Sequence, residues 1–102
     1  MSVYQTARFE VRLEALEICQ QAIRVFVEYI RVHEPDTLSY ISLQENDDPV
    51  KFLHIFIFRD ADAKDTHANS EAVDRFTGTL YPNLVAPVKF TEYQVLADTG
   101  PR

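Results

Sequence analysis

The sequence predicts an α+β protein with a ferredoxin-like fold, built on a four-stranded antiparallel sheet. Apolar residues follow strand or helix spacing in the order strand, helix, strand, strand, helix, strand. This order is the split β-α-β arrangement of ferredoxin-like folds. The third strand is apolar on both faces, which predicts that each face is covered. One domain is expected over residues 1–102, with its core in residues 3–97 and a loose tail at 98–102.

The first strand and the first helix follow two different periodicities. Residues 3–11 alternate apolar and polar side chains, as a strand with one buried face does. Residues 14–31 follow helical spacing, and Pro35 ends this helix because the residue before a proline avoids helical angles. The apolar residues at helical spacing form a stripe along the helix, and a second apolar row beside it predicts that the helix is covered on more than one side. The members of this second row are Ile18, Ala22, Val25 and Tyr29.

The second half of the chain is divided by turn and capping residues. Asn, Asp and Pro residues between the second and third strands predict a hairpin. Asp60 is predicted to cap a short helix, and Ser70 to cap the helix after it. The predicted elements are strands at residues 37–45, 50–59 and 89–97, and helices at residues 60–67 and 71–80.

The third strand also predicts how the chain assembles. Its side chains are apolar on both faces, with Phe52, Phe56 and Phe58 on one face and Leu53, Ile55 and Ile57 on the other. A chain of 102 residues has too few helices to cover both faces of a sheet. We therefore expect another copy of the chain to cover the second face, which makes the protein a homodimer.

Composition excludes several classes of function. The net charge is −6 and the basic residues are scattered, so neither nucleic acid nor an anionic membrane surface is an expected partner. Two glycines are too few for the loops that bind phosphates in nucleotide-binding proteins. No apolar run reaches the ~20 residues of a membrane span. The first residues lack the features of a signal peptide, so a cytoplasmic location is expected.

Two histidines are candidates for proton chemistry, since imidazole has an unperturbed pKa of about 6.5. His54 is the polar residue in an apolar strand, where it must be hydrogen-bonded or line a cavity. His67 can cap its short helix or point into a pocket between helix and sheet. Closely spaced ligands such as H-x-x-x-H are absent, so no metal site is predicted. The single cysteine, Cys19, lies in the helical stripe and is expected to be buried.

Three stretches resemble a known protein family. They are residues 34–40 (EPDTLSY), the pattern FRDxxAxxxHxxS at residues 58–70, and residues 89–93 (KFTEY). Together they are similar to the antibiotic biosynthesis monooxygenase family, and the likeness covers nearly the whole chain. The resemblance implies a dimeric α+β barrel, in which two four-stranded sheets face each other and the helices lie outside.

The resemblance also implies a class of reaction. The family includes oxygenases that convert phenols or quinols to quinones without metal or flavin, so no cofactor is expected. The deprotonated substrate itself passes an electron to O2. The sequence departs from the family at Phe56 and Phe58, where members often carry a Glu and a Trp. It contains no tryptophan, which argues against the haem-degrading branch of the family.

These arguments predict a cofactor-independent monooxygenase that acts on a small aromatic or quinol-like molecule. His67 would orient or deprotonate the substrate and His54 would assist, while the pocket walls would be Tyr40, Phe58, Phe76 and Tyr81. Two alternatives stay open. One is an isomerase acting on a small carbonyl compound, for which Arg8 is the only candidate to bind a phosphate. The other is a ligand-binding dimer without turnover.

Overall fold

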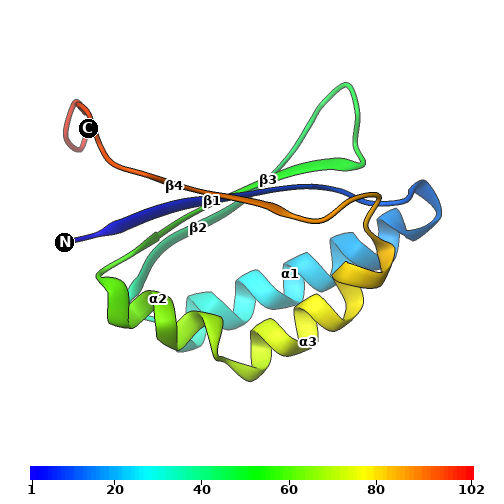
Figure 1. The fold of residues 1–102 in the computed structure, drawn as a ribbon, viewed down its shortest axis with the longest axis horizontal. Helices are drawn as coiled ribbons and strands as arrows, with labels where there is room; N and C mark the ends of the chain where they lie inside the picture. Colours follow the sequence, from blue (N-terminus) through cyan, green and yellow to red (C-terminus); the bar gives the residue numbers. More distant parts are fainter.

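The computed structural model describes all residues, Met1–Arg102, and consists of one sheet with helices on one of its faces (Figure 1). The antiparallel strands lie in the order β2-β3-β1-β4, which confirms the predicted ferredoxin-like α+β fold. None of the helices is both long and apolar enough to cross a membrane. The strands are β1 (Val3–Glu10), β2 (Thr37–Gln44), β3 (Lys51–Phe58) and β4 (Lys89–Tyr93); the helices are α1 (Leu16–His33), α2 (Ala61–Ala68) and α3 (Glu71–Leu80), with 3-10 turns at Leu13–Ala15 and Tyr81–Asn83.

The last strand is shorter than predicted. β4 ends at Tyr93 rather than at residue 97, because its only neighbour is β1 and Tyr93 already pairs with Tyr4, near the start of that strand. The residues beyond Tyr93 have no strand to pair with, and the exposed side chain of Leu96 shows that they do not pack on the core. Figure 1 shows this segment running past the edge of the sheet to the C-terminus.

The helix α1 packs on the sheet with one side and on α3 with its flank. Cys19, Ile23, Phe26 and Ile30 form its buried row. The prediction that its second apolar row is also covered is wrong for Ile18 and Val25, which are exposed, because α3 covers only one flank of α1. The buried position predicted for Cys19 is confirmed, and burial raises the pKa of its thiol.

The two faces of the sheet differ in their cover. Phe52, His54, Phe56 and Phe58 alternate along β3 and are buried beneath the helices. The side chains between them point to the other face, where no helix lies (Figure 1). We call this second side the open face; its apolar residues are Tyr4, Ile41, Leu43, Leu53, Ile55, Ile57 and Tyr93.

Both predicted N-caps are confirmed. The Asp60 carboxylate accepts a hydrogen bond from the backbone N–H of Ala63 at 2.8 Å, at the start of α2. The Ser70 hydroxyl accepts one from the backbone N–H of Val73 at 3.2 Å, at the start of α3. Each cap satisfies a helix N–H that has no partner within its helix, so the two caps divide the segment into two helices.

Replacing the Asp60 cap tests how much it stabilises α2. Asp60→Ala removes the acceptor and should lower the free energy of unfolding by about 1 kcal/mol in urea denaturation. Asp60→Asn is the matched control, because asparagine caps helices about as well as aspartate and should leave most of the stability. Equal losses in the two variants would show that the carboxylate acts by its charge rather than as a cap.

Candidate functional site

A cavity of about 330 Å³ lies between the sheet and the helices. This volume is at the lower end of the range found for small-molecule sites. Residues of all four strands and all three helices contribute to its wall, and most of them are apolar. The six residues predicted as site residues all line this one cavity; they are Tyr40, His54, Phe58, His67, Phe76 and Tyr81.

His67 reaches the cavity from α2 and is held there by a carboxylate. Its Nδ1–H donates to Glu34 Oε1 at 2.8 Å, and the Thr37 hydroxyl donates to the same oxygen at 2.8 Å. Both side chains of the His67–Glu34 pair are about 10% exposed. Because an ionised carboxylate only accepts hydrogen bonds, Glu34 places the imidazole proton on Nδ1. The lone pair then lies on Nε2, which makes no hydrogen bond within the chain.

Glu34 owes its position to the end of α1. It follows the last residue of that helix and precedes Pro35, and its backbone has left the helical region as the residue before a proline does. The second carboxylate oxygen, Oε2, is buried and has no hydrogen-bond partner. His67 and Thr37 are therefore the only groups in the chain that hydrogen-bond the Glu34 carboxylate.

His54 is held in a different way, with both ring nitrogens occupied. The Tyr40 hydroxyl lies 2.7 Å from Nδ1, and the Ser42 hydroxyl lies 2.8 Å from Nε2. The three residues face one another because Tyr40 and Ser42 alternate along β2 and pair with Phe56 and His54 of β3. Burial lowers the pKa of His54 to about 4, so the ring is neutral at pH 7.

These geometries separate the two histidines chemically. His67 keeps a free nitrogen and a carboxylate that would stabilise its protonated form. His54 has no free nitrogen, and its charged form is disfavoured by burial. Proton abstraction from a ligand is therefore better suited to His67 than to His54.

Aromatic rings surround both histidines. Phe26 of α1 stacks on Phe76 of α3, with ring centroids 4.4 Å apart and planes 7° from parallel. Tyr40 stacks on Phe56 at 5.0 Å, and Phe58 lies 5.2 Å from the His67 ring. A wall of this kind offers flat apolar surfaces to a ring-shaped ligand and few polar groups to orient it.

Comparisons with known proteins identify the family of the chain. The model of the antibiotic biosynthesis monooxygenase family matches residues 2–78, about three quarters of the chain. The chain belongs to this family. The comparison with curated proteins finds no match.

Solved structures share the fold of this monooxygenase family member at low sequence identity. Rv0793 from Mycobacterium tuberculosis is 21% identical with a TM-score of 0.87, and the match covers 98% of this chain and 100% of that one. A mutant of SnoaB, a cofactor-independent oxygenase from Streptomyces nogalater, is 14% identical with a TM-score of 0.82 and covers 98% of each chain. A crystal structure described as an antibiotic biosynthesis monooxygenase is 23% identical with a TM-score of 0.87, covering 93% of this chain and 99% of that one.

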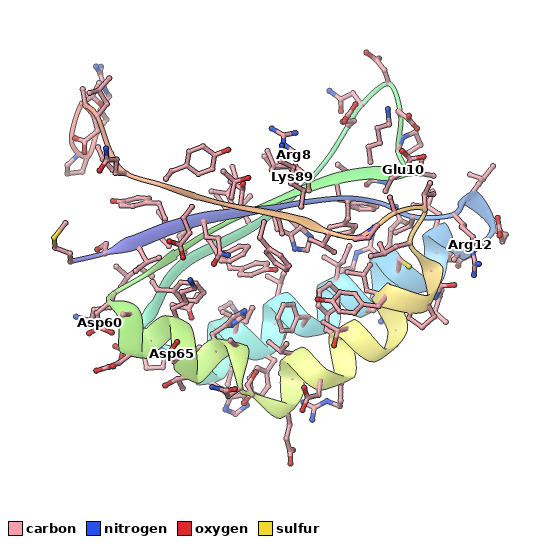
Figure 2. The ribbon with its side chains drawn as sticks, viewed as in Figure 1. Arg8, Glu10, Arg12, Asp60, Asp65 and Lys89 are labelled. Carbon is pink, nitrogen blue, oxygen red and sulfur yellow. The ribbon has the colours of Figure 1, made fainter.

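Some features of the cavity and its surroundings were missed or misplaced in the sequence prediction. Arg8 cannot bind a phosphate in the cavity, because it pairs with Leu53 and Lys89 on the open face of the sheet. Figure 2 shows Arg8 and Lys89 together on the side of the sheet away from the helices. The basic residue that does line the cavity is Lys64 of α2, which forms an ion pair with Glu92 of β4.

The partners of the two histidines were also missed. Ser42 could have been found from the hairpin, since a residue two positions from Tyr40 on a paired strand shares its face. No local pattern indicates that Glu34 contacts His67, because 33 residues separate them.

No three side chains of the His, Cys, Asp and Glu types come close enough to hold a metal ion.

The stability of the protein should depend on pH through His54. Its pKa is lowered to about 4 in the folded protein, so the unfolded chain takes up a proton first as the pH falls. His54 contributes about 3 kcal/mol to the free energy of unfolding in this way. This contribution is complete above about pH 6.5 and is lost as the pH falls from there to about pH 4. Urea denaturation across this range should show the loss.

A pair of variants isolates this effect from the titration of other groups. His54→Phe should lower stability at every pH, because Tyr40 and Ser42 lose their partner, but it should flatten the slope between pH 4 and 6.5. His33→Gln changes an exposed histidine and should keep the slope. An unchanged slope in His54→Phe would contradict the assignment.

Proposed function

We propose that this protein is a cofactor-independent monooxygenase that oxidises a small aromatic molecule of the phenol or quinol type with O2. The observation that carries the proposal is the His67–Glu34 pair, which leaves one imidazole nitrogen without a partner on a residue that lines an aromatic cavity. Membership of the monooxygenase family and the fold shared with SnoaB support it. The substrate class rests on the shape and chemistry of the cavity.

The first step would be the removal of a hydroxyl proton from the substrate. Nε2 of His67 would accept this proton, and the adjacent Glu34 carboxylate would stabilise the imidazolium that forms. The negative charge left on the aromatic oxygen makes the ring electron-rich. The mostly apolar wall suits this step, because it offers few groups that would compete with His67 for the proton.

The following steps would use O2 as the only oxidant. The phenolate gives one electron to O2, and the resulting radical and superoxide join to form a carbon–oxygen bond. The imidazolium of His67 returns its proton to the peroxide, and loss of water then yields the quinone. One phenol and one O2 are consumed, and one quinone and one water are formed. The protein would contribute a base, a proton donor and an apolar cavity, and the substrate would reduce O2 itself.

The aromatic residues would hold the substrate in place. Phe58 and Phe76 lie on opposite sides of the cavity, on β3 and α3, and Tyr81 lies after α3. Flat rings in these positions would pack on a flat substrate by stacking or edge contacts. Tyr40 adds a hydroxyl to a wall that is otherwise mostly apolar.

The open face of the sheet supports a homodimer as part of this proposal. Leu53, Ile55 and Ile57 form a continuous apolar row in the middle of the sheet, and Ile41 and Leu43 extend it onto β2. Soluble monomers rarely leave large apolar patches uncovered. If a second copy of the chain packed its sheet against this one, the apolar row of each copy would cover that of the other.

Oxygen consumption by the purified protein tests the function. We expect O2 uptake and quinone absorbance with a member of a panel of phenols and quinols, in the presence of a chelator and without added flavin. His67→Gln should lower kcat by about 10²-fold or more, since this is the usual contribution of a general base. Glu34→Gln should lower it less, because glutamine can still accept from Nδ1 but carries no charge.

The controls separate the alternatives. His33→Gln should leave turnover unchanged, because His33 is exposed and lies outside the cavity. Full turnover in His67→Gln would refute the role of His67. An isomerase of a carbonyl compound would work equally well without O2, and a binding dimer would retain ligands without converting them.

The oligomeric state is tested by a charge in the apolar row. Ile55→Lys should convert the dimer to a monomer in sedimentation velocity, because a buried lysine without a partner is strongly unfavourable. Val25→Lys is the matched control, since Val25 is exposed on α1, away from the open face. A wild-type protein that is monomeric at all concentrations would contradict the proposed dimer.

A further inference from the structure

Lys64 is the only basic side chain in the wall of the cavity. No other lysine or arginine lines it, and no aspartate or glutamate does. The Glu34 carboxylate that holds His67 also lies outside the set of lining residues. A lysine ammonium is charged at pH 7, and its attraction for an anion is stronger beside apolar side chains than in water. The cavity is therefore suited to a ligand that carries a negative charge.

The present partner of Lys64 is a carboxylate that can be displaced. Lys64 forms an ion pair with Glu92 of β4, whose side chain is 56% exposed, whereas that of Lys64 is 34% exposed. Glu92 lies on an edge strand, so its carboxylate can turn into water. Ion pairs with an exposed partner are weak, because water screens the attraction and the paired side chains lose freedom. Another carboxylate can thus take the place of Glu92 at little cost.

Lys64 and His67 lie on the same face of α2. They are three residues apart, on successive turns, and both line the cavity. Figure 1 shows α2 beneath the end of the sheet where β1 begins and β4 ends. Gln5 of β1 pairs with Glu92 and also lines the cavity, and its side-chain amide can donate a hydrogen bond to a carboxylate. One small ligand can therefore reach Lys64 with one end and His67 with the other.

We propose that Lys64 binds a carboxylate of the substrate, so that the preferred substrate is a phenol-type molecule with an acidic side group. This inference deepens the proposed function and rests on its phenol-type substrate. The substrate carboxylate replaces Glu92 at the Lys64 ammonium, and the Gln5 amide donates a second hydrogen bond to it. The charged end of the substrate is thereby held at Lys64, and its hydroxyl faces His67.

Such an anchor supplies what the aromatic wall lacks. Flat apolar rings hold a flat ligand but do not decide which of its edges faces His67. A charge at one end of the ligand fixes this orientation, and binding at an unreactive group can position the reacting hydroxyl.

The number of cations favours a carboxylate over a phosphate. A phosphate monoester carries a charge of about −2 at pH 7, and a single lysine would leave part of that charge without a partner in an apolar cavity. A carboxylate carries one negative charge, which Lys64 alone neutralises, as it neutralises Glu92 in the absence of a ligand.

Binding measurements under nitrogen test the anchor without turnover. The probes are 5-hydroxy-1-naphthoate, its neutral amide of the same shape, and 5-hydroxy-1-naphthyl phosphate, each titrated in a calorimeter. The dissociation constant of the carboxylate should be about tenfold lower than that of the amide, as expected for a hydrogen bond to a charged group. The phosphate should bind more weakly than the carboxylate. Equal affinity for carboxylate and amide, tighter binding of the phosphate, or no binding of any probe would overturn the inference.

Two variants that break the same ion pair separate binding from a structural role. Lys64→Met keeps the length of the side chain but removes the cation, so carboxylate binding should weaken about tenfold and the preference over the amide should disappear. Glu92→Gln removes the competing carboxylate, so the same probe should bind about threefold more tightly, with amide binding unchanged within about twofold. If the ion pair served only to hold α2 on β4, both variants would change carboxylate binding in the same direction, and this result would overturn the inference.

The outcomes for the function and for the inference can be told apart. A preference for the carboxylate in a protein that consumes no O2 with any substrate would refute the proposed oxygenase and leave the anchor standing. Consumption of O2 by a protein that binds carboxylate and amide equally would refute the anchor alone.

Discussion

The central strand β3 sets the constraint on which the other features depend. It has a neighbour on each edge, and its helix-facing side chains, His54 among them, are buried. Its backbone groups are used in the ladders to β1 and β2, and they are not available to a side chain. His54 therefore needs hydroxyl partners from a neighbouring strand, and the register places Tyr40 and Ser42 of β2 within reach. The polar chemistry at this side of the cavity thus follows from the pairing of the sheet.

The other polar group depends on where helices end. Pro35 stops α1 and leaves Glu34 outside the helix, beside the start of β2. The Asp60 cap fixes the first turn of α2, and His67 lies near its last turn. The hydrogen bond between His67 and Glu34 joins these two segments, so the orientation of the imidazole is set by two helix ends rather than by a flexible loop.

The sequence was sufficient for those features that depend on local pattern. Alternation and capping residues predicted the sheet, the helices and the face of β3 that carries His54, because each of these is decided within a few residues. The errors arose where the structure depends on a contact between residues that are far apart in the sequence. Strand β4 ends where β1 has no more residues to pair with, and Glu34 meets His67 from a different segment. A single sequence contains no signal for contacts of this kind.

Two buried histidines in one apolar cavity need an explanation beyond stability. Each requires partners that an apolar side chain of similar size would not, and such exceptions to the local rules are expected where a protein has a functional site. The two are not duplicates: His67 keeps a free nitrogen next to a carboxylate, whereas His54 is neutral with both nitrogens engaged. One arrangement is suited to taking up a proton from a ligand, whereas the other holds the Tyr40 and Ser42 hydroxyls in place without a buried charge.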